Sequence, residues 1–325
     1  MDDQNDLMSI FYLTVCKRFN QEVDNYLSCH SVIFDGECFD ETFWDRRPTI
    51  LLPLEKLLSK CPKLTRLRTC VVDCAISDEI NDLPEMTYLT DLMIDIVAIK
   101  ANHTQLETFF KKCPNLTKLE LIQFKEFESS TFNFNCLSDK ITELSFVGIT
   151  PQTFKDLMNT KTFNLNLLSI DSHQIYRDED FVDMIAKVNE KYPELKSFNF
   201  IIWELWGPVN VLPKLPNLEN FVLFYNEGDI SYEKAQDMLQ SMPKLRSLDF
   251  TSFICPQVDQ LIEICARHCR KLERLVNTNI STPNYVTERG LELWKQLPHL
   301  RTVNDKTFQE WQTFDPDKDQ DDSPS

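Results

Sequence analysis

The sequence predicts an α/β solenoid of about ten to eleven stacked repeats. One short pattern returns along the chain, for example as CPNLTKLEL from residue 113, YPELKSFNF from 192, LPNLENFVL from 215 and MPKLRSLDF from 242. Its first apolar residue falls at 64, 89, 116, 141, 165, 195, 218, 245, 272 and 300, so neighbouring copies are 23 to 30 residues apart. Self-similarity at a period of this size is the signature of repeat architectures.

Each repeat is expected to contribute one short strand and one helical stretch. In the L-x-x-L-x-L core, the last two apolar positions alternate with polar ones, as a strand with one buried face requires. Helical stretches are predicted between the strands at 150–159, 178–192, 231–242 and 255–269. Thr150 is expected to cap one helix and Pro256 to begin another. Because a single unit cannot bury its own apolar face, the units must stack, with a parallel inner sheet and an outer wall of helices.

These residues resemble the leucine-rich repeat family over roughly residues 50 to 305, particularly its longer cysteine-containing and ribonuclease-inhibitor-like types. The resemblance implies a horseshoe-shaped repeat domain, which we place at residues 29–311. Cys61, Cys113 and Cys269 each stand three residues before the first apolar position of a repeat. We expect them to be small, buried residues at the junction between helix and strand. Phe154, Phe181 and Trp294 are likewise expected in the core.

The N-terminal stretch LTVCKRFNQEVDNYL, residues 13–27, is predicted to be an amphipathic helix. Its core from Val15 to Phe19 resembles the end of an F-box, although the opening Leu-Pro helix of that family has no counterpart before Asp6. We therefore assign residues 1–28 to a partial F-box-like segment, followed by a first strand-like stretch, HSVIFDGE. The alternative is a helix that only caps the first repeat. The resemblance implies that this segment docks a Skp-family adaptor through Leu7, Ile10, Val15 and Phe19.

Composition narrows the classes of partner. The 34 basic and 51 acidic residues give a net charge of −17, which disfavours nucleic acid and anionic membrane as partners, and no basic patch of useful size stands out in the sequence. The acidic start MDDQND lacks the order of a secretory signal, and no apolar run reaches the ~20 residues of a membrane span. We expect a cytoplasmic or nuclear protein with reduced cysteines and an acidic, disordered tail at 312–325.

No motif for catalysis, a cofactor or a metal stands out. The five glycines are isolated, and HExxH and GxSxG are absent. Cys265, His268 and Cys269 share one helical face, but a fourth zinc ligand is not apparent, so packing is the favoured interpretation. Asp317, Asp319 and Asp321 lack the Gly and the closing Glu of a calcium loop. The sequence therefore predicts a binding protein without cofactors rather than an enzyme.

F-box proteins with leucine-rich repeats are substrate receptors of SCF-type cullin-RING ubiquitin ligases, in which the repeats hold the substrate. The resemblance implies this function; the alternative is a stand-alone repeat scaffold or inhibitor that has lost adaptor binding. Residues between the buried positions of each strand should line the concave face. We predict partner contact there along repeats five to eight, through an apolar centre and a polar rim: Asp171, Asn199, Ile201, Trp203, Trp206, Asn220, Val222, Phe224 and Asp249. Both tryptophans could instead fill the connection between repeats six and seven.

Overall fold

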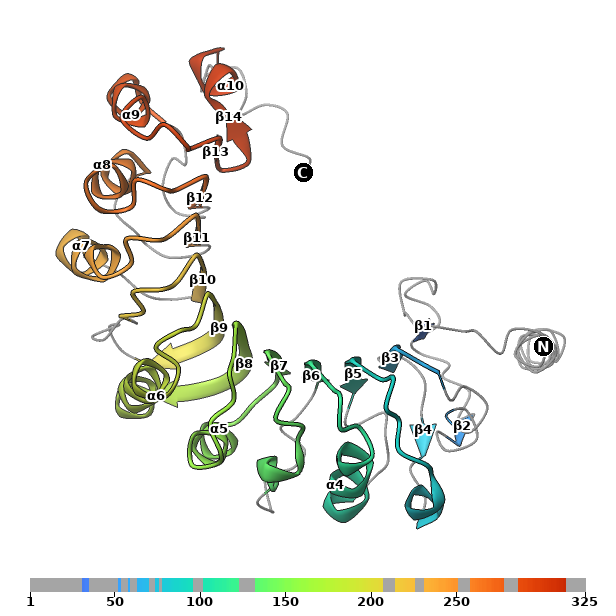
Figure 1. The fold of residues 1–325 in the computed structure, drawn as a ribbon. Helices are drawn as coiled ribbons and strands as arrows, with labels where there is room; N and C mark the ends of the chain where they lie inside the picture. The colour runs from blue at the N-terminus through green and yellow to red at the C-terminus, as the bar shows by residue number, and fades with distance from the viewer. Residues whose placement is uncertain are drawn as a thin grey trace, which may run out of the picture. The chain divides into compact units, whose positions relative to one another are not determined.

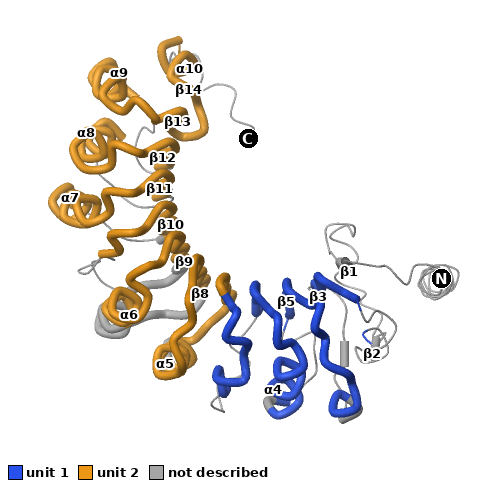
Figure 2. The backbone as a smooth tube through the Cα atoms, in the orientation of Figure 1, with its two compact units in different colours: residues 1–126, 132–141 blue, residues 127–131, 142–325 orange. Residues whose placement is uncertain are grey.

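The computed structural model describes residues 31–34, 52–53, 58, 63–69, 74–75, 78–95, 102–122, 132–206, 214–225, 231–250, 258–277 and 286–313. The chain divides into two compact units, drawn in different colours in Figure 2. Unit 1 comprises residues 1–126 and 132–141, and unit 2 comprises residues 127–131 and 142–325.

Unit 1 contains a parallel sheet whose strand order follows the sequence. Its strands are β1 (Ser31–Phe34), β3 (Arg66–Thr69), β5 (Asp91–Asp95) and β6 (Lys118–Ile122). The predicted first strand at HSVIFDGE is confirmed by β1. A second, two-stranded parallel sheet pairs β2 (Leu52–Pro53) with β4 (Cys74–Ala75). The helical elements are η2 (Asp78–Asp82), α4 (His103–Lys111) and η4 (Phe134–Cys136).

Unit 2 repeats the same arrangement over a longer sheet. Its parallel strands, again in sequence order, are β7 (Glu143–Val147), β8 (Leu167–Arg177), β9 (Ser197–Trp206), β10 (Asn220–Tyr225), β11 (Ser247–Asp249), β12 (Arg274–Val276) and β13 (Thr302–Val303). Its helices are α5 (Pro151–Met158), α6 (Asp178–Lys191), α7 (Tyr232–Gln240), α8 (Val258–His268), α9 (Glu288–Trp294) and α10 (Phe308–Thr313). Within this unit, α5 to α9 lie along one side of the strands (Figure 1).

The four predicted helices are confirmed, and their ends have identifiable causes. The Thr150 side chain accepts a hydrogen bond from the backbone N–H of Thr153, so α5 begins at Pro151 with an N-cap followed by proline. Ser231 and Thr287 cap α7 and α9 in the same way. The Nζ of Lys191 donates to the carbonyls of Leu157, Met158 and Thr160 at 2.8–3.0 Å, which satisfies the open C-terminal end of α5. Pro256 lies outside the described residues.

The repeat core is where the sequence period predicts it. All ten first apolar positions, from Leu64 to Leu300, are buried. Phe154 and Trp294 are buried as expected, whereas the side chain of Phe181 is not described. The Cys113 thiol donates to the Phe109 carbonyl at 3.3 Å, and the Cys269 thiol lies 3.5 Å from the Leu239 carbonyl. The buried junction is therefore confirmed for these two cysteines, while Cys61 lies outside the described residues.

Backbone hydrogen bonds keep successive repeats in phase just before each strand begins. The carbonyl of Lys196 accepts the N–H groups of Glu219 and Asn220, at 2.7 and 2.9 Å. The residue after the first apolar position does the same in other repeats of both units, for example Thr90 in unit 1 and Glu219 and Arg246 in unit 2. Each repeat therefore begins its strand at the same height as its neighbour, and equivalent positions form straight rows across the sheet.

Two strands of unit 2 are longer than the repeat pattern predicts. β8 and β9 run for 11 and 10 residues, and their pairing continues from Ser172 past an irregularity to Arg177 opposite Trp206. They are the long arrows of Figure 1. Trp203 and Trp206, which could have filled the connection between repeats six and seven, therefore lie in the second half of β9.

The C-terminal edge of the unit 2 sheet is closed by a hairpin. The short strand β14 (Lys306–Thr307) pairs antiparallel with β13, and Asn304 and Asp305 take positive φ angles of 48° and 60° in the turn. Such a turn suits Asn and Asp, whose side chains tolerate the left-handed conformation. Helix α10 then packs back, and its Trp311 Nε1 donates to the Val303 carbonyl at 2.8 Å. An edge strand that would otherwise expose unpaired backbone groups is thereby covered.

The segments predicted at the two ends of the chain lie largely outside the described residues. Helix α10 continues through Gln312 and Thr313, so the first two residues of the predicted tail are helical. Residues 314–325 and the F-box-like segment at 1–28, with Leu7, Ile10, Val15 and Phe19, lie outside the described residues. Among the helices of the described part, none combines the length and apolar character needed to cross a membrane.

Candidate interaction surface

Each sheet has one face against the helices and one face turned away from them, which we call the open face. In β7 the burial alternates, so that Leu144 and Phe146 are buried while Glu143, Ser145 and Val147 are partly exposed. The same alternation holds in β5, β6 and the first halves of β8 and β9. Because successive side chains of a strand point to opposite faces, the partly exposed set lies on the open face.

The leucine-rich repeat fold is thereby established. It rests on parallel strands in sequence order, a helix or 3-10 helix between most neighbouring strands of the described chain, and one buried stripe per strand.

Comparisons with known proteins find only distant structural similarities. No family model matches the chain, and no curated protein matches it significantly in sequence. Among solved structures, the chain is similar to one from the yeast Rad7 and Elc1 complex, at 15% identity and a TM-score of 0.48, covering 92% of this chain and 72% of that one. The leucine-rich repeat-containing protein LegL7 from Legionella pneumophila has 15% identity, a TM-score of 0.38 and coverages of 72% and 73%. The leucine-rich repeat domain of APL1B has 14% identity, a TM-score of 0.37 and coverages of 77% and 66%.

The apolar centre of the predicted partner surface forms in the leucine-rich repeat strands β9 and β10. Ile201 lies opposite Phe224 in the parallel register, and Val222 precedes Phe224 by two residues on the same face. All three side chains are partly exposed. These positions lie inside the strands, since β9 and β10 continue to Trp206 and Tyr225. The open-face centre, as we call these three residues, is a contiguous group.

Two straight rows of side chains connect this centre to its polar surroundings. The upper row runs Val147, Asp171, Ile201, Phe224, and the lower row runs Ser145, Ser169, Asn199, Val222, Asp249. Asp171 therefore lies between two apolar neighbours of its row. Asn220 lies two residues before Val222 in β10, so the structure brings together seven of the nine predicted partner-binding residues.

Trp203 and Trp206 are the remaining two. Both lie in the second half of β9, and Trp206 pairs with Arg177 of β8. Their side chains are not described, so the choice between open face and core stays a prediction.

The polar rim is held by contacts within the sheet. Asn220 Nδ2 donates to Ser197 Oγ in the neighbouring strand at 3.0 Å. Arg274 lies between two carboxylates, with its Nη1 3.5 Å from Asp249 Oδ2 and its Nη2 3.1 Å from Asp305 Oδ1. These pairs are solvent-accessible and contribute little stability, but they hold polar groups at defined positions beside the apolar centre.

Behind the open-face centre lies a layer of phenylalanines. The rings of Phe198 and Phe200 are 5.5 Å apart, and Phe221 lies 6.1 Å from Phe198 and 6.2 Å from Phe250. All four are fully buried. A packed aromatic layer holds β9 and β10 firmly, so the open face presents a preformed surface rather than one assembled on binding.

Leu167 is one residue that the sequence interpretation missed. It is a partly exposed apolar side chain on the open face, opposite Ser197, two positions after the first apolar residue of its repeat. The signal was present, because the same offset selects Ser197 and Asn220 in the next two repeats. The predicted centre consists of positions four or six residues after the first apolar residue, and Leu167 precedes both in its repeat.

The structure describes the packing of two of the cysteines in the Cys265, His268 and Cys269 group. Cys265 and Cys269 are buried, and the Cys269 thiol contacts the backbone carbonyls of Leu239 and Met242. In the described parts of the chain, no group of three His, Cys, Asp or Glu side chains is placed to hold a metal ion.

Proposed function

We propose that this chain is a protein-binding receptor that captures its partner on the open face of β8 to β11. The register that sets Ile201 beside Phe224, with Val222 next to them, carries the proposal. A contiguous apolar group within a polar surface is the usual mark of an interaction site. The surrounding Asp171, Asn199, Asn220 and Asp249 would give the polar rim that surrounds the centre of most protein interfaces.

We further propose that the bound partner is a substrate for ubiquitin ligation. The support is the N-terminal match from Val15 to Phe19, which resembles the end of an F-box and precedes the repeats directly. In this proposal the N-terminal segment docks a Skp-family adaptor linked to a cullin, the repeats hold the substrate, and the chain itself performs no catalysis. If the N-terminal helix only caps the first repeat, the chain is instead a stand-alone scaffold or inhibitor.

Adaptor binding is tested with purified components. The intact chain and a chain that begins at residue 28 are mixed with a Skp-family adaptor, and complex formation is measured by size-exclusion chromatography. We expect a complex only with the intact chain, and its loss on Phe19→Ala. No complex with the intact chain would leave the scaffold role as the function.

Partner capture is tested separately by charge substitution in the centre. Ile201→Lys combined with Phe224→Lys should remove the captured partners, while adaptor binding and the melting temperature stay nearly unchanged, since both side chains are already partly exposed. Gln240→Lys, an exposed position at the end of α7 on the helix side, is the matched control. If the double variant unfolds, the two side chains belong to the core and the proposed surface is wrong.

A further inference from the structure

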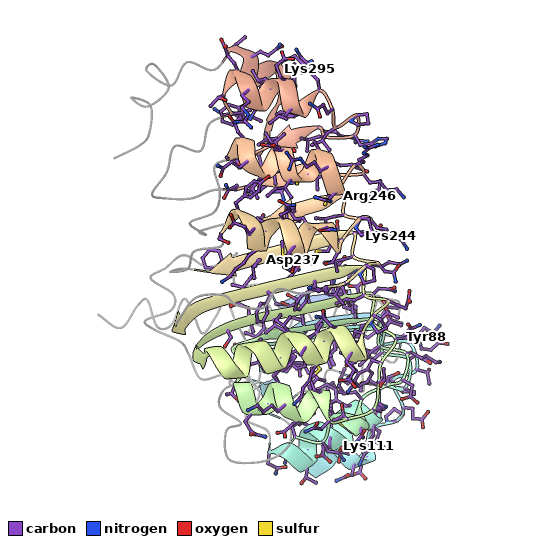
Figure 3. All side chains as sticks on the ribbon, turned by 90° about the vertical axis from the view of Figure 1, so that its left-hand side faces the viewer. Tyr88, Lys111, Asp237, Lys244, Arg246 and Lys295 are labelled. Carbon is purple, nitrogen blue, oxygen red and sulfur yellow. The ribbon has the colours of Figure 1, made fainter. Side chains whose placement is uncertain are left out.

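A second candidate surface of unit 2, this one charged, lies at the edge of the sheet where the turns lead into the strands. The turns before β11, β12 and β13 carry six exposed basic or imidazole side chains, which we call the basic edge: Lys244, Arg246, Arg270, Lys271, His299 and Arg301. Lys244 and Arg246 project from this margin, beside the helix layer, in Figure 3. These six residues come from three repeats that are 27 or 28 residues apart, so they do not form a basic run in the sequence.

These residues are close together because they occupy equivalent positions in stacked repeats. Arg246, Glu273 and Arg301 occupy the same position in three successive repeats, and each donates its backbone N–H to the carbonyl of the preceding repeat. Lys244 and Lys271 likewise occupy one common position in neighbouring repeats, followed by His299. Neighbouring strands are ~4.8 Å apart, so the three turns span only ~10 Å. Residues 27 or 28 apart in sequence thus become direct neighbours.

The charge of this edge changes along unit 2. In the two preceding repeats the equivalent positions hold Glu194, Lys196, Asn217 and Glu219, with more acidic than basic residues. On the basic edge, five Lys or Arg side chains accompany a single carboxylate, Glu273. The excess of positive charge is therefore local, in a chain whose net charge is −17.

Glu273 shows how the basic edge receives a carboxylate. Arg246 Nε donates to Glu273 Oε1 at 2.8 Å, and Arg301 Nη2 lies 4.0 Å from Glu273 Oε2. The hydrogen bond from Arg246, followed by the nearby positive charges, lowers the pKa of the Glu273 carboxyl. Lys244, Arg270 and Lys271 provide further exposed cations beside this contact. Arginine is well suited to carboxylates because its planar fork of donors matches their geometry.

From this edge we propose a second docking site, which binds an extended, acidic segment of a partner protein. A span of ~10 Å corresponds to three or four residues of extended chain, so a run of three or four Asp or Glu side chains fits it. Acidic protein is favoured over nucleic acid because the edge is short, contains Glu273 at its middle and belongs to a strongly acidic chain that repels a phosphate backbone. The site is separate from the open face and does not depend on the function proposed for it.

The test uses the intact chain and a fluorescein-labelled hexaglutamate peptide, with binding followed by fluorescence anisotropy. We expect binding that weakens as salt rises from ~50 to ~300 mM, and no binding of a Gly-Ser peptide. A single exposed ion pair changes affinity by roughly 1.5- to 5-fold. Charge reversal removes this attraction and adds a repulsion of similar size, so reversing Lys244, Lys271 and Arg301 to Glu together should lower the affinity by at least about tenfold.

Lys196→Glu is the matched control, because Lys196 is an exposed lysine on the same margin two repeats before the basic edge. It should change the affinity by less than about twofold. Thermal melting of each variant, followed by circular dichroism, separates loss of binding from loss of fold. A second triple variant, with Gln instead of Glu at Lys244, Lys271 and Arg301, removes the positive charges without adding negative ones. The proposal is overturned if the intact chain binds hexaglutamate no better than the Gly-Ser peptide, if the triple reversal leaves the affinity unchanged, or if a single-stranded oligonucleotide of equal charge binds more tightly.

Discussion

Replacement of Gly290 by alanine tests the close packing of α8 against α9. A methyl group on Gly290 would stand 2.1 Å from Asp259 Oδ1, 2.7 Å from Val286 Cγ1 and 2.8 Å from Asp259 Cγ. Asp259 cannot move away freely, because it is 9% exposed and accepts hydrogen bonds from the backbone N–H and the hydroxyl of Thr287. Thr287 in turn is the N-cap of α9. The alanine must therefore displace a buried carboxylate from a helix cap.

The magnitude follows from three contributions. Overpacking of a filled site costs typically about 1–3 kcal/mol, and a hydrogen bond to a charged group contributes about 1.5–3 kcal/mol. Replacing glycine by alanine within a helix stabilises the helix by up to ~1 kcal/mol, which offsets part of this cost. We therefore expect Gly290→Ala to lower the free energy of unfolding of unit 2 by about 2–4 kcal/mol.

Urea unfolding followed by tryptophan fluorescence measures this change, since Trp294 is buried within α9 itself. In an Asp259→Ala background the clashing carboxylate is absent, so Gly290→Ala should cost at least ~1 kcal/mol less there. A Gly290→Ala variant that is as stable as the parent chain, or more stable, would refute the close approach of α8 and α9.

Two further predictions concern single side chains. Thr150→Ala should lower the free energy of unfolding, measured in urea, by about 1 kcal/mol, because it removes the acceptor for the Thr153 N–H at the start of α5. Thr150→Ser keeps a hydroxyl and should retain most of this stability. Equal losses in both variants would argue against capping. Burial raises the pKa of the Cys113 thiol above its usual 9.0, so iodoacetamide at pH 8 should modify Cys113 only after unfolding. Because the folded state holds the thiol proton more tightly, the contribution of this thiol to stability is complete below pH 9 and declines as pH rises above that value. Modification of Cys113 in the folded chain would contradict the burial.

Most of the structure within each repeat could be predicted from the sequence. The spacing of the first apolar residues, the alternation that follows each and the N-cap at Thr150 are local patterns, determined by the period of a strand or helix and by backbone groups a few residues away. Cys113 and Cys269 were likewise placed correctly, because a buried junction recurs at one position of the repeat. The apolar centre at Ile201 and Phe224 followed from the same counting, since equal offsets in neighbouring repeats become neighbours in a parallel sheet.

Other features arise only when distant segments meet, and their signals in the chain are weak. The length of β8 and β9 depends on the pairing of Arg177 with Trp206, which no local pattern specifies. The approach of Gly290 to Asp259 joins residues of two different helices, and glycine in a helix would otherwise suggest only flexibility. The hairpin after Val303 exists because the last parallel strand would otherwise expose its edge.

The pattern of residues was enough to predict the α/β repeat, its period and its buried stripe, because each repeat must bury the same face in the same way. Which side chains share a surface depends on how the repeats stack. Net charge alone disfavoured anionic partners, yet stacking three repeats in register collects Lys244, Lys271 and Arg301 on one margin of an acidic chain. Composition averages over all residues, whereas the Coulomb interaction depends on the distances between individual charges, and only the stacked repeats set those distances.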